Sequence, residues 1–153
     1  MNRKPIIGVI GGGFCTTEIS EIAEKVGEKI AEKGAILICG GLGGVMEAAC
    51  KGAKNKNGIT IGILPGNDIN DANPYVDFPV ATGMGFARNI IIVWTAQCLI
   101  AINGKYGTLS EIAYALAFNK PVVGLKTHKI EGNLIEARSP EDAVELAFKM
   151  IKI

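Results

Sequence analysis

The chain has 153 residues, of which 48% are hydrophobic and 20% are charged, so it is expected to fold as one domain spanning 1–153. Its formal net charge of +1 offers no electrostatic footprint for duplex nucleic acid or an anionic membrane, and neither partner is expected. No apolar run approaches the roughly 20 residues of a membrane span, and the N-terminus has no signal-peptide pattern. We therefore expect a cytoplasmic protein.

Five short apolar runs, rich in Ile and Val, are expected to be β-strands. Their apolar residues are continuous rather than alternating, which is typical of strands buried on both faces of a parallel sheet. Helical patterns separate most of these runs, and this alternation predicts an α/β fold with a doubly wound parallel sheet in a three-layer αβα sandwich. The expected strands are 6–10, 35–39, 59–64, 98–102 and 121–125.

Helical periodicity predicts a first helix over about 17–33 and a last helix that runs from residue 140 to the chain end. Gly34 is expected to stop the first helix. Ser139 is the expected N-cap of the last helix, with Pro140 in its first turn.

A helix expected over 84–97 is apolar nearly all round, and such a helix must be covered on more than one side. A domain of this size offers it one sheet face. The pattern therefore predicts a homodimer packed through this helix, and a tetramer remains an open alternative.

The four cysteines contain no Cys-x-x-Cys pair, and the one histidine, His128, lies in a different part of the chain. No metal site is expected. Buried, unreactive thiols are the simplest interpretation.

Three glycine-rich turns each follow an expected strand and precede a helical pattern. Glycines there let backbone N–H groups approach an anion, and the helix behind them adds positive potential. Thr16 replaces the last glycine of a dinucleotide fingerprint, and no acidic residue closes the second strand, so NAD-linked chemistry is not expected. The turns, at 11–13, 40–44 and 103–108, predict a site for a phosphorylated ligand, although the second would also serve tight packing of a strand against a helix.

Two charged residues are the candidates for catalysis. Arg88 is the only charged residue between Asp77 and Lys105, and a buried arginine needs an anionic partner, which is either a ligand phosphate or a structural carboxylate. Glu111 lies at the start of a helical pattern. It is placed to face a ligand, but it also fits a capping box in which the Thr108 hydroxyl accepts from the N–H of residue 111.

The remaining candidates are backbone and side-chain groups for ligand or phosphate binding. A polar loop over 65–74 is expected to be a solvated turn, with contact to a ligand or metal as its alternative. The ligand-binding candidates are Gly12, Gly13, Gly40, Gly41, Gly43, Gly44, Glu47, Thr82, Asn89, Gly104, Lys105, Gly107 and Thr108.

The order of four segments resembles the superfamily of the Lonely Guy phosphoribohydrolases and the molybdenum-cofactor carrier proteins, and more closely its carrier branch. The segments are 40–48, 64–66, 87–89 and 107–112. The resemblance implies a Rossmann-like fold, a dimer or tetramer, and a phosphate-recognising pocket at the carboxyl ends of the strands. In the phosphoribohydrolases, the positions of Arg88 and Glu111 are catalytic, and the reaction releases a free base and ribose 5-phosphate from a nucleoside 5′-monophosphate.

The third turn departs from the phosphoribohydrolase pattern, because Asn103 replaces its proline and Lys105 replaces its second glycine. Binding without turnover, as the resemblance implies for the carrier branch, tolerates this change more easily. The expected function is therefore binding or carriage of a phosphorylated small molecule, either a nucleotide or a molybdopterin-like compound. Nucleotide phosphoribohydrolase activity is the alternative. No cofactor is required, and molybdenum cofactor enters only as a possible bound ligand.

Overall fold

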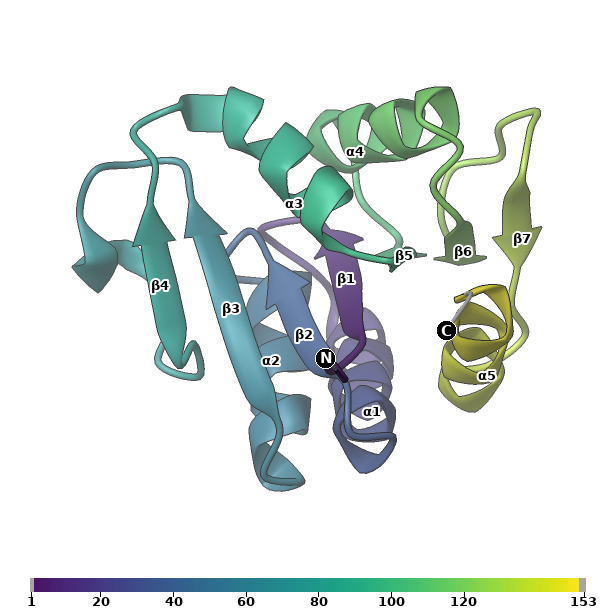
Figure 1. Cartoon of the computed structure of the whole chain (residues 1–153), viewed down its shortest axis with the longest axis horizontal. Coiled ribbons are helices and arrows are strands. Elements are labelled where there is room, and N and C mark those ends of the chain that lie inside the picture. Colours follow the sequence, from purple (N-terminus) through teal and green to yellow (C-terminus); the bar gives the residue numbers. More distant parts are fainter. Residues whose placement is uncertain (1, 152–153) are drawn as a thin grey trace.

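The structure is a computed structural model that describes residues 2–151, and within them seven strands form one sheet in the order β4-β3-β2-β1-β5-β6-β7 (Figure 1). Every neighbouring pair is parallel. The fold is therefore the expected α/β, Rossmann-like sandwich. The strands are β1 (Ile6–Gly11), β2 (Ile36–Cys39), β3 (Ile59–Leu64), β4 (Phe78–Ala81), β5 (Cys98–Ile102), β6 (Val122–Leu125) and β7 (Leu134–Glu136).

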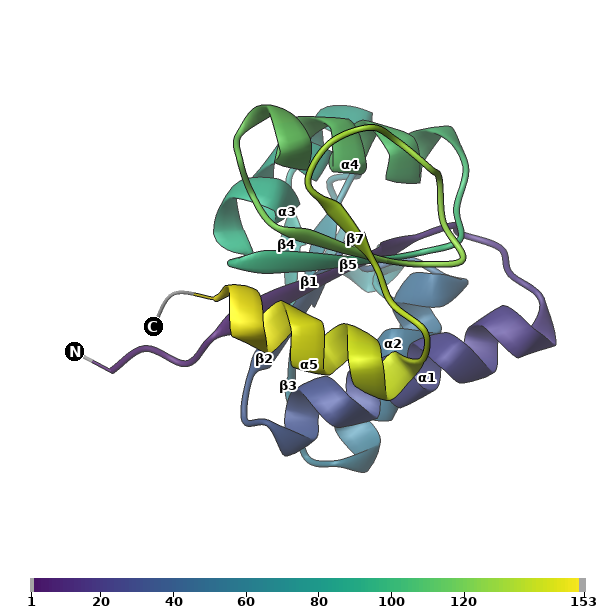
Figure 2. The same cartoon turned by 90° about the vertical axis from the view of Figure 1, so that its right-hand side faces the viewer.

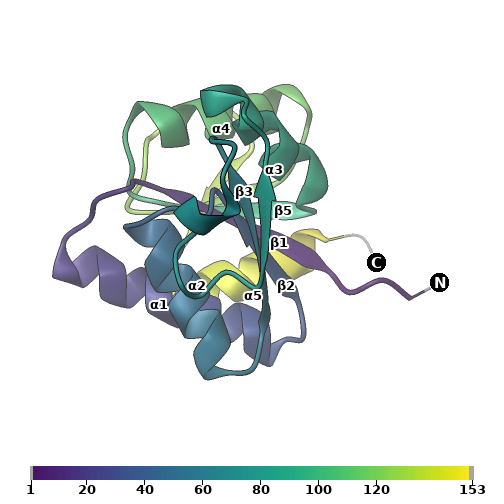
Figure 3. The same cartoon turned by 90° about the vertical axis from the view of Figure 1, so that its left-hand side faces the viewer.

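Helices cover both faces of the sheet. Figures 2 and 3 show α1 (Thr17–Glu32), α2 (Val45–Asn55) and α5 (Pro140–Met150) on one face, and α3 (Asn89–Thr95) and α4 (Tyr106–Ala117) on the other. Successive strand residues point to opposite faces, so Val9 joins the core beneath α1 and α2 while Ile10 joins the core beneath α3 and α4. Burial on both sides explains the continuous apolar runs of the central strands.

The five expected strands are confirmed, with ends that move by one residue at most, but the sequence pattern missed the two edge strands β4 and β7. Both are short, and their side chains are exposed or half-buried. Their apolar runs, 78–81 and 134–135, are shorter than those of the expected strands. Pro79 lies in β4, which fits an edge position because proline cannot donate to a ladder hydrogen bond.

The expected bounds of the first helix and the expected start of the last helix are confirmed, but the last helix does not run to the chain end, because Ile151 is extended. The Thr16 hydroxyl caps α1 by accepting from the N–H of Ile19 at 3.3 Å, and Gly34 follows its end with a φ of +76°. Ser139 caps α5 by accepting from the N–H of Asp142 at 3.1 Å. The last helix ends at Met150, and residues 152–153 lie outside the described part of the chain.

The expected helix over 84–97 is wrong in its extent. A 3₁₀ turn, η2 (Gly85–Arg88), precedes a short α3 over Asn89–Thr95. Gly85 has a φ of +59°, which is incompatible with an α-helix, and Ala96 is extended on entry to β5. None of the helices within residues 2–151 combines the length and apolarity that a membrane crossing needs.

Candidate functional site

A cavity of about 400 Å³ opens at the carboxyl ends of the central strands. The strand order reverses at β1, which lies between β2 and β5, and open α/β sheets bind ligands at such a switch point. Most of the expected site residues meet here. The cavity is lined by Gly12, Gly13, Gly40, Arg88, Asn89, Gly104, Lys105, Gly107, Thr108 and Glu111, together with other residues of the same turns.

Five of the expected site residues lie elsewhere. Gly44 and Glu47 line a neighbouring cavity between α1 and α2. Gly43 is close to the Glu47 carboxylate, since a Cβ built on it would lie 3.9 Å from Oε2. Gly41 packs against Leu64, and the Thr82 hydroxyl donates to the Leu64 carbonyl at 2.6 Å.

Sequence reasoning missed the aromatic side chains that line the cavity. Phe14 is 99% exposed and Phe86 is 80% exposed. Phe14 directly follows the first glycine turn, and Phe86 precedes Arg88 by two residues. Their positions beside expected site residues were the available signal, because large apolar side chains that remain exposed next to a cavity are candidates for ligand contact.

The N-terminus of α4 forms one wall of the cavity. The N–H of Leu109 donates to the carbonyl of Lys105 at 2.9 Å and begins the helical ladder. The N–H groups of residues 106–108 therefore have no helical acceptor. Gly107 and Thr108 line the cavity, so this end of the helix presents donors and positive potential to it.

The expected capping box at Thr108 is wrong. The N-cap of α4 is Lys105, three residues earlier, and Thr108 already lies inside the first helical turn. Its Oγ1 atom is buried and is the one buried side-chain oxygen or nitrogen within residues 2–151 that has no hydrogen-bond partner. Leaving a buried hydroxyl unpaired is costly, and this orphaned group at the cavity fits a ligand acceptor.

Arg88 lies beneath the cavity and is only 7% exposed. Its Nε donates to the Ile63 carbonyl at 2.9 Å, one terminal nitrogen donates to the Asn89 side chain, and the other reaches the Gly40 carbonyl at 3.5 Å. Arginine has five N–H donors, so these three contacts leave two of its N–H groups for a ligand. Within residues 2–151 no carboxylate forms a salt bridge with Arg88, and its charge therefore remains open to an anionic ligand.

Glu111 faces the same cavity from α4 and is also 7% exposed. Burial raises the pKa of its carboxyl to about 8, and the nearby charge of Arg88 opposes this only in part. Burial likewise lowers the pKa of Arg88, with Glu111 acting in the opposite direction. Near pH 7, Glu111 is therefore mostly protonated while Arg88 stays cationic, and the pair carries a net positive charge.

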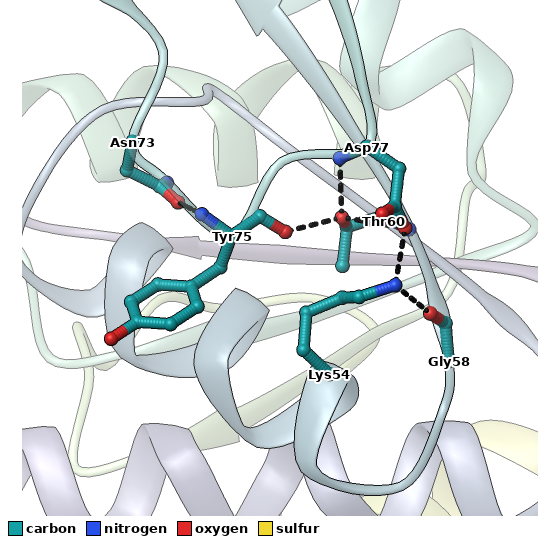
Figure 4. A network of polar contacts seen from close by, with 6 residues as sticks. All are labelled: Lys54, Gly58, Thr60, Asn73, Tyr75 and Asp77. Atoms are coloured by element: carbon teal, nitrogen blue, oxygen red, sulfur yellow. Dashed lines mark hydrogen bonds and ion pairs between the residues drawn. The ribbon is translucent and has the colours of Figure 1, made fainter.

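The loop before β4 holds the second glycine turn in place. Asn73 donates from its backbone N–H to the Gly41 carbonyl and from Nδ2 to the Leu42 carbonyl, both at 2.9 Å. Its Oδ1 accepts from the N–H of Tyr75 at 3.0 Å. The Tyr75 carbonyl accepts from the Thr60 hydroxyl at 2.6 Å (Figure 4).

The same network continues to α2. The N–H of Asp77 donates to the Thr60 hydroxyl at 2.9 Å, and Lys54 pairs with the Asp77 carboxylate, also at 2.9 Å (Figure 4). The loop is therefore tied to β3 and α2, and through Asn73 it fixes Leu42, which lines the cavity. No group within residues 2–151 gathers enough ligands to hold a metal ion.

Replacing Asn73 with aspartate is expected to lower the free energy of unfolding by about 1–3 kcal/mol, because the isosteric side chain loses the donor to Leu42 and turns a carboxylate toward that carbonyl. Urea unfolding measures the loss. The exposed Asn67 of the same loop supplies the matched control, and its change to aspartate should stay within about 0.5 kcal/mol of wild type. Equal effects at the two positions would contradict a holding role for Asn73.

A sequence model of the SLOG cluster4 family matches residues 4–151. The chain belongs to the SLOG cluster4 family. This SLOG cluster4 protein is 51% identical to an uncharacterized protein from Archaeoglobus fulgidus over 138 residues, which cover 90% of this chain and 91% of the relative.

Two solved structures extend the comparison of this SLOG cluster4 protein. The molybdenum cofactor binding protein from the phototrophic bacterium Rippkaea orientalis has a TM-score of 0.93 and 40% identity, with 98% of this chain and 99% of that chain covered. The Moco carrier protein from Chlamydomonas reinhardtii has a TM-score of 0.89 and 38% identity, with 97% and 98% covered. The resemblance to the carrier-protein branch is thus confirmed.

Proposed function

We propose that this protein binds or carries a phosphorylated small molecule, either a nucleotide or a molybdopterin-like compound, in the cavity at the carboxyl ends of the strands. The observation that carries the proposal is the orphaned Thr108 hydroxyl beside the free N–H groups of α4. A phosphate monoester supplies the acceptor oxygens that these donors lack. The similarity to a molybdenum cofactor binding protein and a Moco carrier protein supports the same class of ligand.

The cavity suits a small molecule in size and charge. Its volume of about 400 Å³ lies within the range typical of small-molecule sites. Arg88 adds a cation with unused donors, and Lys105 is exposed at the rim. For molybdenum cofactor as cargo, the protein would contribute these phosphate-binding groups.

Hydrolysis of nucleoside monophosphates is the alternative function, because Arg88 and Glu111 line one cavity. Its oxocarbenium-like transition state needs a negative carboxylate. Burial raises the pKa of Glu111 to about 8, so most of that charge is absent near pH 7, which favours binding without turnover. Release of free base from AMP tests the alternative, and equal background rates for wild type and Glu111→Ala would exclude it.

Calorimetry with AMP, GMP and molybdenum cofactor tests the binding proposal. The Gly107→Ala variant tests whether the ligand binds in this cavity. Gly107 lies in the first turn of α4, where a Cβ would meet only Phe86, at 3.7 Å. Alanine should stabilise the helix by about 0.5–1 kcal/mol. The same methyl group enters the cavity wall and should weaken ligand binding about tenfold or more.

Tyr106→Ala is the matched control for Gly107→Ala, since Tyr106 belongs to the same turn but does not line the cavity. Its ligand affinity should equal that of wild type. A Gly107→Ala protein that binds as tightly as wild type would place the ligand elsewhere. Failure of every phosphorylated ligand to bind the wild-type protein would refute the proposed function.

We also propose that the protein forms a homodimer through the face of α3 and α4, with a tetramer left open. Trp94 of α3 is 61% exposed. Its ring lies 5.8 Å from that of Phe118, which in turn stacks on Tyr114 at 6.3 Å. An exposed aromatic cluster of this kind is typical of a protein interface, and a monomer by light scattering at micromolar concentration would contradict the proposal.

A further inference from the structure

Two buried thiols face one another behind the second glycine turn. Cys39 ends β2 and Cys50 lies in the middle of α2. Their Sγ atoms are 3.5 Å apart, and both side chains are fully buried. Cys15 lies in the loop before α1, and the Cys98 thiol is directed to the Leu99 carbonyl, so the close pair stands apart from the other two cysteines.

The surroundings of Cys39 distinguish the two sulfurs. The N–H of Gly41 donates to the Cys39 sulfur at 3.3 Å. The hydrogen bond shared with Cys50 lowers the pKa of Cys39, against the opposing effect of burial, and the charge of Arg88 acts in the same direction as the hydrogen bond. The same partnership and burial raise the pKa of Cys50. The Gly41 N–H and the charge of Arg88 both favour a thiolate on Cys39, which makes Cys39 the more nucleophilic member of the pair.

We propose that Cys39 and Cys50 are a site of reversible covalent modification, at which the two thiols close to an intramolecular disulfide. The sulfurs need to approach from 3.5 Å to about 2.05 Å. A small peroxide is the fitting oxidant for a buried pair. The Cys39 thiolate attacks one peroxide oxygen and becomes a sulfenic acid, and the departing hydroxide takes up the proton that the Cys39 thiol released on ionisation and leaves as one water.

The second step completes the disulfide. The Cys50 sulfur attacks Cys39 Sγ and expels the hydroxyl group, which leaves as a second water with the Cys50 proton. In total, two thiols and one hydrogen peroxide give one disulfide and two waters. A dithiol reductant reverses the modification by thiol–disulfide exchange.

Formation of the disulfide is expected to change contacts of residues next to the candidate site. Oxidation draws the Cys39 sulfur toward Cys50 and weakens the hydrogen bond that this sulfur accepts from the Gly41 N–H. Gly40, between these two residues, lines the cavity and accepts from Arg88 at 3.5 Å. We therefore expect the oxidised protein to bind its ligand less tightly. This effect rests on the proposed function, whereas formation of the disulfide does not.

The test oxidises the full-length protein with hydrogen peroxide. Of the four cysteine thiols, two should be lost per chain, with an intact mass lower by about 2 Da and full recovery after a dithiol reductant. Peptide mapping of the wild-type protein should recover Cys39 linked to Cys50. Cys39→Ser and Cys50→Ser should abolish this mass change, and Cys15→Ser should retain it.

The results separate the modification from the proposed function. Cys39 and Cys50 that remain free thiols while Cys15 oxidises would overturn the modification site, and the wild-type map decides this even if a serine variant fails to fold. Calorimetry with AMP should give an affinity roughly fivefold or more lower after oxidation. Equal affinities would overturn the link to the site alone. If AMP fails to bind the reduced protein too, the disulfide result still stands by itself.

Discussion

Replacing Arg88 with glutamine is expected to weaken the binding of a phosphorylated ligand about 100-fold or more. Arg88 is the buried cation of the cavity, and its guanidinium retains two N–H donors after its contacts with Ile63, Asn89 and Gly40. Charge-assisted hydrogen bonds to phosphate are about twice as strong as neutral ones, so their loss together with the charge has a large effect. Calorimetry with AMP as the probe measures the change.

Arg88→Lys is the informative companion variant. It keeps the charge but cannot reproduce the planar fork that reaches three acceptors, so its affinity should fall between those of wild type and Arg88→Gln. Both proteins need a circular dichroism spectrum and an unfolding curve, because Arg88 is buried and its loss leaves carbonyl oxygens unpaired. A folded Arg88→Gln protein that binds AMP as wild type does would show that the cavity is not the anion site.

Replacing Glu111 with glutamine is expected to remove a strong pH dependence of stability. The pKa of Glu111 is about 8 in the folded protein, compared with 4.5 for an ordinary glutamate, so the folded state binds this proton more tightly than the unfolded state. The stability that the proton provides is present at low pH and is lost as the pH rises toward 8. Between pH 5 and pH 8 the loss of this proton from Glu111 should lower the free energy of unfolding by roughly 3 kcal/mol.

Urea unfolding of wild type and Glu111→Gln across this pH range gives the measurement. Glutamine cannot ionise, so the variant should gain in stability relative to wild type as the pH rises. Glu136→Gln, at the exposed end of β7, is the surface control for the same carboxylate-to-amide change. Parallel curves for wild type and Glu111→Gln would mean that the buried carboxyl does not titrate in this range.

The positions of the five buried strands and of the three glycine turns follow from local patterns. Continuous Ile- and Val-rich runs identify central strands because helices cover both faces of the sheet. Glycines that follow such strands identify the turns that meet at their carboxyl ends. The edge strands β4 and β7 left only shorter apolar runs, since their side chains are exposed or half-buried.

The capping box expected at Thr108 is wrong because a local sequence pattern does not fix the residue at which a helix begins. Threonine followed three residues later by glutamate is the pattern of a capping box, and nothing in that stretch reveals that the helix starts earlier, at Tyr106. The start is set by the turn at Gly104, whose φ is +97° and where a Cβ would lie 2.2 Å from the Thr108 hydroxyl. The Thr108 hydroxyl therefore packs beside Gly104 and makes no hydrogen bond to a backbone N–H.

By itself, then, the sequence determined the α/β fold and the three glycine turns, because periodicity and turn chemistry act over a few residues. The family resemblance implied that Arg88 and Glu111 share one site, and both line the same cavity. The tertiary structure alone decided the charge state of that site and the contacts made by the residues around it. The pKa of Glu111 depends on burial by distant segments, Asn73 reaches the Gly41–Leu42 turn from a loop about 30 residues away, and Cys39 meets Cys50 only when α2 packs on β2. Each of these depends on distances between elements, which no local pattern encodes.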